Sequence, residues 1–263
     1  MKTIRFEFRE HGSVKYHTAH IPETLSEATG QQFTALLALS QGRIAEEQFF
    51  LNFFGIPEKM LPLLDLWQLY VLTDQLRDIW RVDKIDHFPI PEILIPWNKE
   101  KRTKSLRLTA PAAQLKGMTF QQFMTVDQFY QWYVYTGKAQ YVLSMVAALY
   151  LEEGKTFAEL DIQHVTARLE NYPDRWVLEG LAFNWGMIRT WLSGAYPHLF
   201  PAAAPDSSGE ARNRTGQKPR PGSWLNIFDT LVGDDLTRIE TYKELPCMDV
   251  IRILDKRIKQ QKA

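Results

Sequence analysis

Few residues in this sequence have both the type and the spacing that catalysis or metal binding requires. His11, His17 and His20 lie close together near the N-terminus. A spacing of three residues would bring two histidines to one face of a helix, but this segment alternates apolar and polar residues as a strand does. On a strand, His17 and His20 face opposite sides, so we expect surface histidines rather than a metal site.

Candidate nucleophiles and acid–base groups are equally isolated. Cys247 follows Pro246 at the start of an expected helix, where the helix dipole could activate a thiol, but burial as a small apolar residue explains it better.

Asp234 and Asp235 after a glycine are typical of a turn. Asp83, Asp86 and His87 have the spacing of a solvated loop. The sequence has neither a G-x-S-x-G elbow nor a glycine-rich phosphate loop, so we predict no enzyme and no cofactor.

Charge gives no strong indication of a nucleic-acid or membrane partner. The chain has 263 residues with 31 basic and 31 acidic side chains, a formal net charge of +0. Two segments are locally basic, Lys99 to Arg107 and Arg212 to Arg220. Each could contact phosphates, but we interpret the first as a solvated loop and the second as a soluble connection. We do not expect nucleic acid as a partner.

Aromatic residues are the most informative feature, because Phe, Tyr and Trp make up 13% of the chain. Rings go around more than one face of the helix expected after residue 119, so that helix is either deeply buried or contacts a partner. Core burial is the simpler explanation. A binding surface for an apolar, helical or unfolded client is the alternative that we carry forward. The candidate partner-binding residues are Phe49, Phe50, Phe53, Phe54, Phe129, Tyr130, Trp132, Tyr133, Trp224 and Phe228.

Periodicity predicts a mainly α protein with minor β structure. Residues 2–9 and 14–18 alternate in polarity around a turn, which indicates an N-terminal β-hairpin. Capping signals and apolar stripes predict helices at 24–40, 43–54, 57–80, 119–136, 138–152, 162–170, 173–193 and 246–259. Three Pro residues between 85 and 97 favour extended chain there, and 106–109 reads as a short strand.

Composition divides the chain into three parts. Residues 1–200 form the expected helical body, 201–222 a flexible linker rich in Pro, Gly, Ser and charge, and 223–263 a small helical module that must dock on the body or on a partner. A single cysteine excludes an intrachain disulfide. Because neither a secretory signal nor an apolar run long enough to span a bilayer is present, we expect a cytoplasmic protein.

The C-terminal module resembles proteins encoded among bacteriophage and prophage tail genes, and the whole architecture resembles tail assembly chaperones. The resemblance rests on Trp224 to Asp234 (WLNIFDTLVGD), on Tyr242, Leu245 and Pro246, and on Val250 to Leu254. It covers about 40 residues well and the body loosely.

This resemblance implies a non-enzymatic protein that shields the apolar helices of a tape-measure protein in the bacterial host. It transfers no individual binding residue, and the protein could also form homo-oligomers. Two alternatives stay open. One is a structural component of a phage tail or neck, and the other is an enzyme without a recognisable motif.

Overall fold

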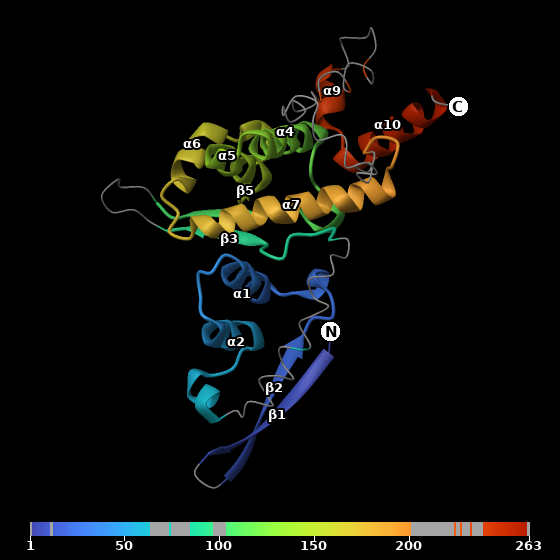
Figure 1. Cartoon of the computed structure of the whole chain (residues 1–263). Coiled ribbons are helices and arrows are strands. Elements are labelled where there is room, and N and C mark those ends of the chain that lie inside the picture. Colours follow the sequence, from blue (N-terminus) through green and yellow to red (C-terminus); the bar gives the residue numbers. More distant parts are fainter. Residues whose placement is uncertain are drawn as a thin grey trace, which may run out of the picture. The chain divides into compact units, whose positions relative to one another are not determined.

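The fold, seen in a computed structural model, is mainly helical with two small antiparallel sheets, as the sequence predicts (Figure 1). The structure describes residues 2–10, 13–63, 85–96, 104–200 and 239–261, together with 74, 224, 227 and 232. Packing divides the chain into two compact units, Met1–Ile85 with Pro89–Pro91, and Asp86–Phe88 with Glu92–Ala263. This division falls inside the range 1–200 that composition treats as one body, and the C-terminal helices belong to the second unit.

The first unit begins with the predicted hairpin. Strands β1 (Lys2–Glu10) and β2 (Ser13–Ile21) pair antiparallel through nine consecutive positions, from Lys2 opposite Ile21 to Glu10 opposite Ser13. Helices α1 (Gly30–Ser40) and α2 (Glu46–Phe54) follow, and α2 packs on β2. The short 3₁₀ segments η1 (Leu25–Glu27) and η2 (Glu58–Leu63) complete the described part of the unit.

Two predicted helices of the first unit differ from the structure. The helix expected from Thr24 is a 3₁₀ turn there, and α1 begins only after Thr29, whose side chain accepts from Gln32 N while Gln32 Oε1 accepts from Thr29 N. This second capping box lies five residues downstream of the first. The helix expected at 57–80 starts as the 3₁₀ segment η2, which contains Pro62, and most of its remainder lies outside the described residues.

The second unit contains a three-stranded sheet in the order β3-β4-β5, formed by Glu92–Ile95, Leu106–Thr109 and Leu151–Glu152. The sheet confirms the strand predicted at 106–109. It also shortens the helix predicted at 138–152, because Leu151 and Glu152 pair with β4 instead of continuing the helix. Successive side chains of β3 and β4 point to opposite faces of the sheet. One face is buried, and it carries Ile93, Ile95, Leu106 and Leu108.

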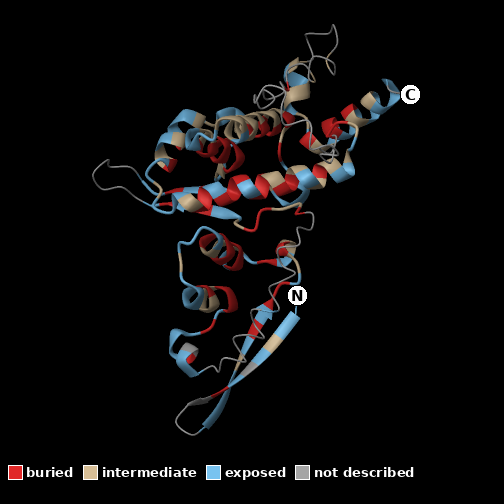
Figure 2. Cartoon of the chain, viewed as in Figure 1, coloured by how far each residue is buried: buried red, intermediate tan, exposed pale blue. Residues whose placement is uncertain are grey.

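The helices of the second unit largely follow their predicted ranges, except that no helix is predicted at 239–244. They are α4 (Phe120–Thr136), α5 (Ala139–Leu149), α6 (Ile162–Leu169), α7 (Arg175–Ala195), α9 (Ile239–Glu244) and α10 (Cys247–Gln261), with 3₁₀ turns η3 (Ala113–Leu115) and η4 (Phe157–Glu159). The predicted stripe of α7 is fully buried: Leu178, Leu181, Ala182, Trp185, Ile188 and Leu192. Figure 2 shows buried, intermediate and exposed segments alternating along α7.

The C-terminal helices dock on α4 through backbone hydrogen bonds as well as side chains. Phe120 N donates to Leu245 O at 2.8 Å, and Cys247 N donates to Met118 O at 2.9 Å. Asp255 Oδ1 accepts from His198 N at 2.8 Å and from Leu199 N at 3.0 Å, beyond the end of α7. The module is therefore held at the start of α10 and near its middle by residues of the helical body. None of the helices in the described ranges combines the length and the apolarity needed to cross a lipid bilayer.

The position of the α1 cap can be tested with two matched substitutions. Thr29→Ala removes the side-chain acceptor for Gln32 N and should lower the free energy of unfolding by about 1 kcal/mol, the usual contribution of an N-cap. Thr24→Ala should change it by much less, because Thr24 makes no side-chain cap hydrogen bond. Urea denaturation followed by circular dichroism measures both. Equal losses for the two variants would contradict the assignment of Thr29 as the cap.

Candidate functional site

The first set of predicted partner-binding rings lies mostly in the core of the first unit. Phe49, Phe53 and Phe54 are buried, and Phe50 is partly exposed. Phe49 stacks on Phe53 with ring centroids 5.1 Å apart, and Phe54 meets Phe53 edge-on at 5.0 Å. The i, i+4 spacing brings Phe49 and Phe53 together on one side of α2, and the next residue, Phe54, borders them. In this structure Phe49, Phe53 and Phe54 therefore contribute to the core rather than to a surface, which corrects the expectation that they would contact a partner.

Helix α4 carries the second set and changes character along its length. Thr119 caps it as predicted, its Oγ1 accepting from Gln122 N at 3.2 Å, and Gly137 ends it with φ of 69°, in the left-handed region that favours glycine. In its first half, Phe120 and Phe123 are fully buried. In its second half, Phe129, Trp132 and Tyr133 are only partly exposed, and Val134 is 52% exposed.

Asp127 lies where the two halves of α4 meet and is completely buried. Its Oδ1 accepts from Trp185 Nε1 at 3.1 Å and lies 3.2 Å from Arg189 Nε. Its Oδ2 accepts from Trp224 Nε1 at 2.7 Å and from Gln131 Nε2 at 2.7 Å. Burying a carboxylate is costly unless it is paired and hydrogen-bonded, and here both oxygens have two partners each.

Trp224 is thus a core residue of the second unit and not a surface anchor. Its ring lies 5.2 Å from that of Phe123, 5.8 Å from that of Phe200 and 6.1 Å from that of Phe120. Its indole N–H contacts Asp127, so both the apolar and the polar part of the side chain are used inside the protein. This corrects its prediction as a partner-binding residue, and Phe228 lies outside the described residues.

Tyr130 also belongs to the neighbourhood of Asp127. A Cβ placed on Gly186 of α7 would lie 2.7 Å from Tyr130 Oη, so the glycine is what lets the phenol approach this helix. The guanidinium of Arg189 lies 5.5 Å from the centroid of the Tyr130 ring. Burial raises the pKa of the Tyr130 phenol, and the positive charge of Arg189 partly opposes this shift.

The remaining rings of α4 form a partly exposed group with one ring of α5, which we name the aromatic surface cluster. Its members are Phe129, Trp132, Tyr133, Tyr135 and Tyr141. Trp132 connects two of the other four, because it stacks on Tyr141 at 6.1 Å and meets Tyr135 edge-on at 5.9 Å. Partly exposed Trp and Tyr side chains are enriched in the anchor positions of protein interfaces. The cluster therefore has the composition of a protein-binding surface.

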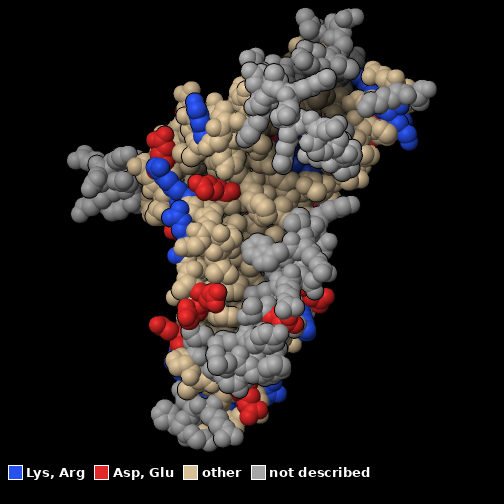
Figure 3. Space-filling view, in the orientation of Figure 1, with Lys and Arg blue, Asp and Glu red and all other residues tan. Residues whose placement is uncertain are grey.

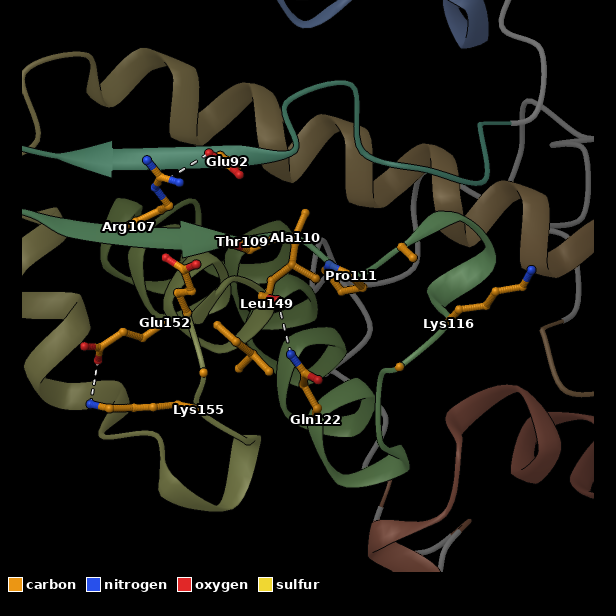
Figure 4. A pocket seen from close by; sticks show the side chains of 15 residues that line it. Glu92, Arg107, Thr109, Ala110, Pro111, Lys116, Gln122, Leu149, Glu152 and Lys155 are labelled. Carbon is orange, nitrogen blue, oxygen red and sulfur yellow. Dashed lines mark hydrogen bonds and ion pairs between the residues drawn. The ribbon is translucent and has the colours of Figure 1, made fainter.

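The second unit also contains a polar hollow of about 510 Å³ beside β4 and β5 (Figure 4). Four of its charged lining residues form two ion pairs: Arg107 with Glu92 at 3.8 Å, and Lys155 with Glu152 at 2.6 Å. The amide of Gln122 donates to Ala148 O and Leu149 O, so it satisfies carbonyls at the end of α5. These groups interact with each other, and we assign no reaction to the hollow.

Of the other residues singled out in the sequence, Asp86 and His87 are in contact, with His87 Nδ1 3.3 Å from Asp86 Oδ1, and the rest do not converge. His17 and His20 lie on opposite faces of β2, opposite Phe6 and Thr3 respectively. Arg107 pairs with Glu92, whereas Lys99, Lys101 and Arg102 lie outside the described residues, as do Asp83, Asp234 and Asp235. Within the described ranges, no three His, Cys, Asp or Glu residues are placed to hold a metal ion. Figure 3 shows charged side chains of both signs scattered over the visible face.

Comparison with known proteins identifies no relative of this chain. No family of known proteins matches it, and neither a curated protein nor a solved structure does.

Replacing Asp127 tests whether the second unit depends on this carboxylate. Asp127→Asn keeps the shape but puts an amide N–H₂ where indole and guanidinium donors require an acceptor. It should lower the free energy of unfolding by about 3 kcal/mol, in the range found when one partner of a buried ion pair is removed. Chemical denaturation followed by circular dichroism measures the change. Asp249→Asn is the matched control, since this exposed carboxylate pairs with Arg252 at the surface. Similar losses for both variants would contradict the role of Asp127.

Cys247 gives a prediction about alkaline pH. Burial raises the pKa of its thiol from 9.0 to about 12, and its Sγ lies 3.8 Å from Leu115 O. As the pH rises above about 9, the thiol of the unfolded chain ionises first, so ionisation favours unfolding. Between pH 8 and pH 10.5 the wild type should lose about 2 kcal/mol more stability than Cys247→Ala, as measured by urea denaturation. Parallel pH profiles of the two proteins would contradict a buried thiol.

Proposed function

We propose that this chain is a non-enzymatic assembly or interaction protein that binds apolar helices of another polypeptide. The observation that carries the proposal is the aromatic surface cluster on α4 and α5. Its rings supply a large apolar contact area, and the hydroxyl groups of its tyrosines keep the free surface compatible with water. The resemblance of the C-terminal module to phage tail proteins supports a tape-measure protein as the client and the cytoplasm of a bacterial host as the location.

The construction of the site favours a rigid surface. The cluster continues directly from the buried half of α4, whose position is fixed by Asp127, Trp185 and Trp224. Trp132 and Tyr141 stack on each other, which limits the rotamers of both rings before a partner arrives. Because little side-chain entropy remains to be lost, more of the contact energy contributes to affinity.

The geometry suits one kind of client in particular. An amphipathic helix presents apolar side chains at i, i+3, i+4 and i+7 and binds a complementary apolar surface along that stripe. The stacked rings of Trp132 and Tyr141, with Tyr135 edge-on to Trp132, offer such a surface at the last turns of α4 and the start of α5. The resemblance to tail assembly chaperones implies a tape-measure protein as the client. The apolar stripes of its long helices must be shielded from water before assembly.

The proposal can be tested by co-expressing the full chain with a long helical tape-measure protein of a tailed phage and isolating the complex by an affinity tag. Trp132→Ala and Tyr133→Ala should each weaken binding about tenfold or more, the effect of truncating an aromatic anchor. Both side chains are partly exposed, so the fold should persist by circular dichroism. Calorimetry with the purified client measures the affinity.

Phe183→Ala is the matched control for this experiment. Phe183 is an aromatic residue of α7 in the same unit and is 45% exposed, but it is not part of the aromatic surface cluster. Its truncation should leave the affinity unchanged. Equal affinity of wild type, Trp132→Ala and Tyr133→Ala would contradict the proposed surface. Recovery of the chain in finished particles would instead favour a structural component of the tail.

A further inference from the structure

The hairpin of the first unit presents a long and regular strand at its edge. β1 and β2 pair over nine positions without a bulge, and in the described part of the chain their sheet consists of these two strands. Natural edge strands are usually short, bulged, interrupted by proline or lined with charged side chains, because their outward N–H and C=O groups can pair with another chain. β1 is long, unbulged and free of proline, and its charged residues are of both signs. Its Lys2, Thr3, Arg5 and Glu7 are all exposed.

The sequence of β1 is complementary to itself when read in the opposite direction. Around Phe6 as the centre, Arg5 corresponds to Glu7, Ile4 to Phe8, and Lys2 to Glu10. Two copies of β1 aligned antiparallel about Phe6 would therefore place a cation opposite an anion at four positions and an apolar residue opposite an apolar residue between them. Opposite charges at directly facing positions stabilise antiparallel strands, and like charges destabilise them.

Neighbouring registers lack this complementarity. Side chains alternate between the two faces of a strand with a period of two. The apolar faces of the two copies therefore stay on the same side of the sheet only when one strand is shifted against the other by two residues. Moving the centre to Arg5 places the two copies of Arg5 opposite each other. Moving it to Glu7 places Glu7 opposite Glu7 and Arg5 opposite Arg9. The register centred on Phe6 is thus the one of the three that brings no like charges together.

We propose that two copies of this chain associate through their β1 edges, antiparallel and centred on Phe6, to form one four-stranded sheet. In this arrangement Arg5 faces the partner's Glu7, and Lys2 faces the partner's Glu10. Ile4, Phe6 and Phe8 continue one apolar row across the junction with the same residues of the second copy. A two-stranded ribbon is marginally stable by itself, and the added strands relieve this. The inference concerns the first unit and does not rest on the proposed function.

The same charge pattern favours a second copy of this chain, and not a different protein, as the partner of β1. An unrelated strand would need its own matching order of charges, whereas β1 already contains both halves of the match. In the single chain, Cζ of Arg5 lies 3.7 Å from the centroid of the Tyr16 ring, and Tyr16 is exposed. A cation in solvent can exchange such a contact for a facing carboxylate at little cost.

Sedimentation equilibrium of the full chain tests this proposal. Over roughly 1–100 µM, where interfaces of modest area associate, the wild type should form dimers. Arg5→Glu places like charges opposite each other twice, because of the two-fold symmetry, and should raise the dissociation constant about tenfold or more. The double variant Arg5→Glu with Glu7→Arg reverses both charges and should return it to within about threefold of the wild type.

Lys15→Glu is the control on the other strand. It makes the same change of charge on β2, and it should leave association unchanged if the contact is made by β1. A wild type that stays monomeric throughout the range would overturn the proposal. So would a folded double variant that stays monomeric, or a Lys15→Glu variant as weak as Arg5→Glu. Circular dichroism of each variant shows whether it is folded.

Discussion

The buried carboxylate of Asp127 is the interaction on which the second unit depends. Its four neighbours come from three parts of the chain: Gln131 from α4 itself, Trp185 and Arg189 from α7, and Trp224 from beyond residue 200. A carboxylate in an apolar interior is stable only while these donors stay in place. The C-terminal part of the chain is therefore joined to the helical body by a polar contact that hydrophobic packing alone could not specify.

This contact also explains why α4 differs between its two halves. On the N-terminal side of Asp127, Phe120 and Phe123 pack against Trp185, Trp224 and Phe200, so aromatic residues there serve stability. On the C-terminal side the docked segments leave Trp132 and Tyr133 partly open. Coverage by other elements thus decides which rings of this one helix belong to the core and which stay partly exposed.

Local patterns in the sequence were enough for much of the fold. The alternation in β1 and β2, the cap at Thr119 and the stripe of α7 each depend on residues within a few positions, and the structure confirms them. The predicted start of α1 is wrong because Thr24 and Thr29 offer two similar capping boxes. The predicted end of α5 is wrong because Leu151 pairs with Thr109, a contact that no local pattern encodes.

The candidate site was harder to predict for the same reason. Periodicity shows that α4 and α2 are rich in rings, but it cannot show what covers them. Trp224 lies 97 residues from Asp127 in the chain, so its burial depends on a contact that only the folded structure reveals. The burial of Phe49 and Phe53 likewise depends on how α2 packs in the first unit. Sequence reasoning found the rings and could not separate core from surface.

The two proposals concern different units, and together they have a physical consequence. A pair of chains joined through β1 would carry two aromatic surface clusters. A long helical client with repeated apolar stripes offers many binding sites, so binding by one cluster raises the effective concentration of its partner's cluster near the same client. Each contact can then be individually weak while the pair of chains still stays bound to the apolar surface of the client. Weak individual contacts also allow release, which an assembly protein requires when its client is passed to the growing structure.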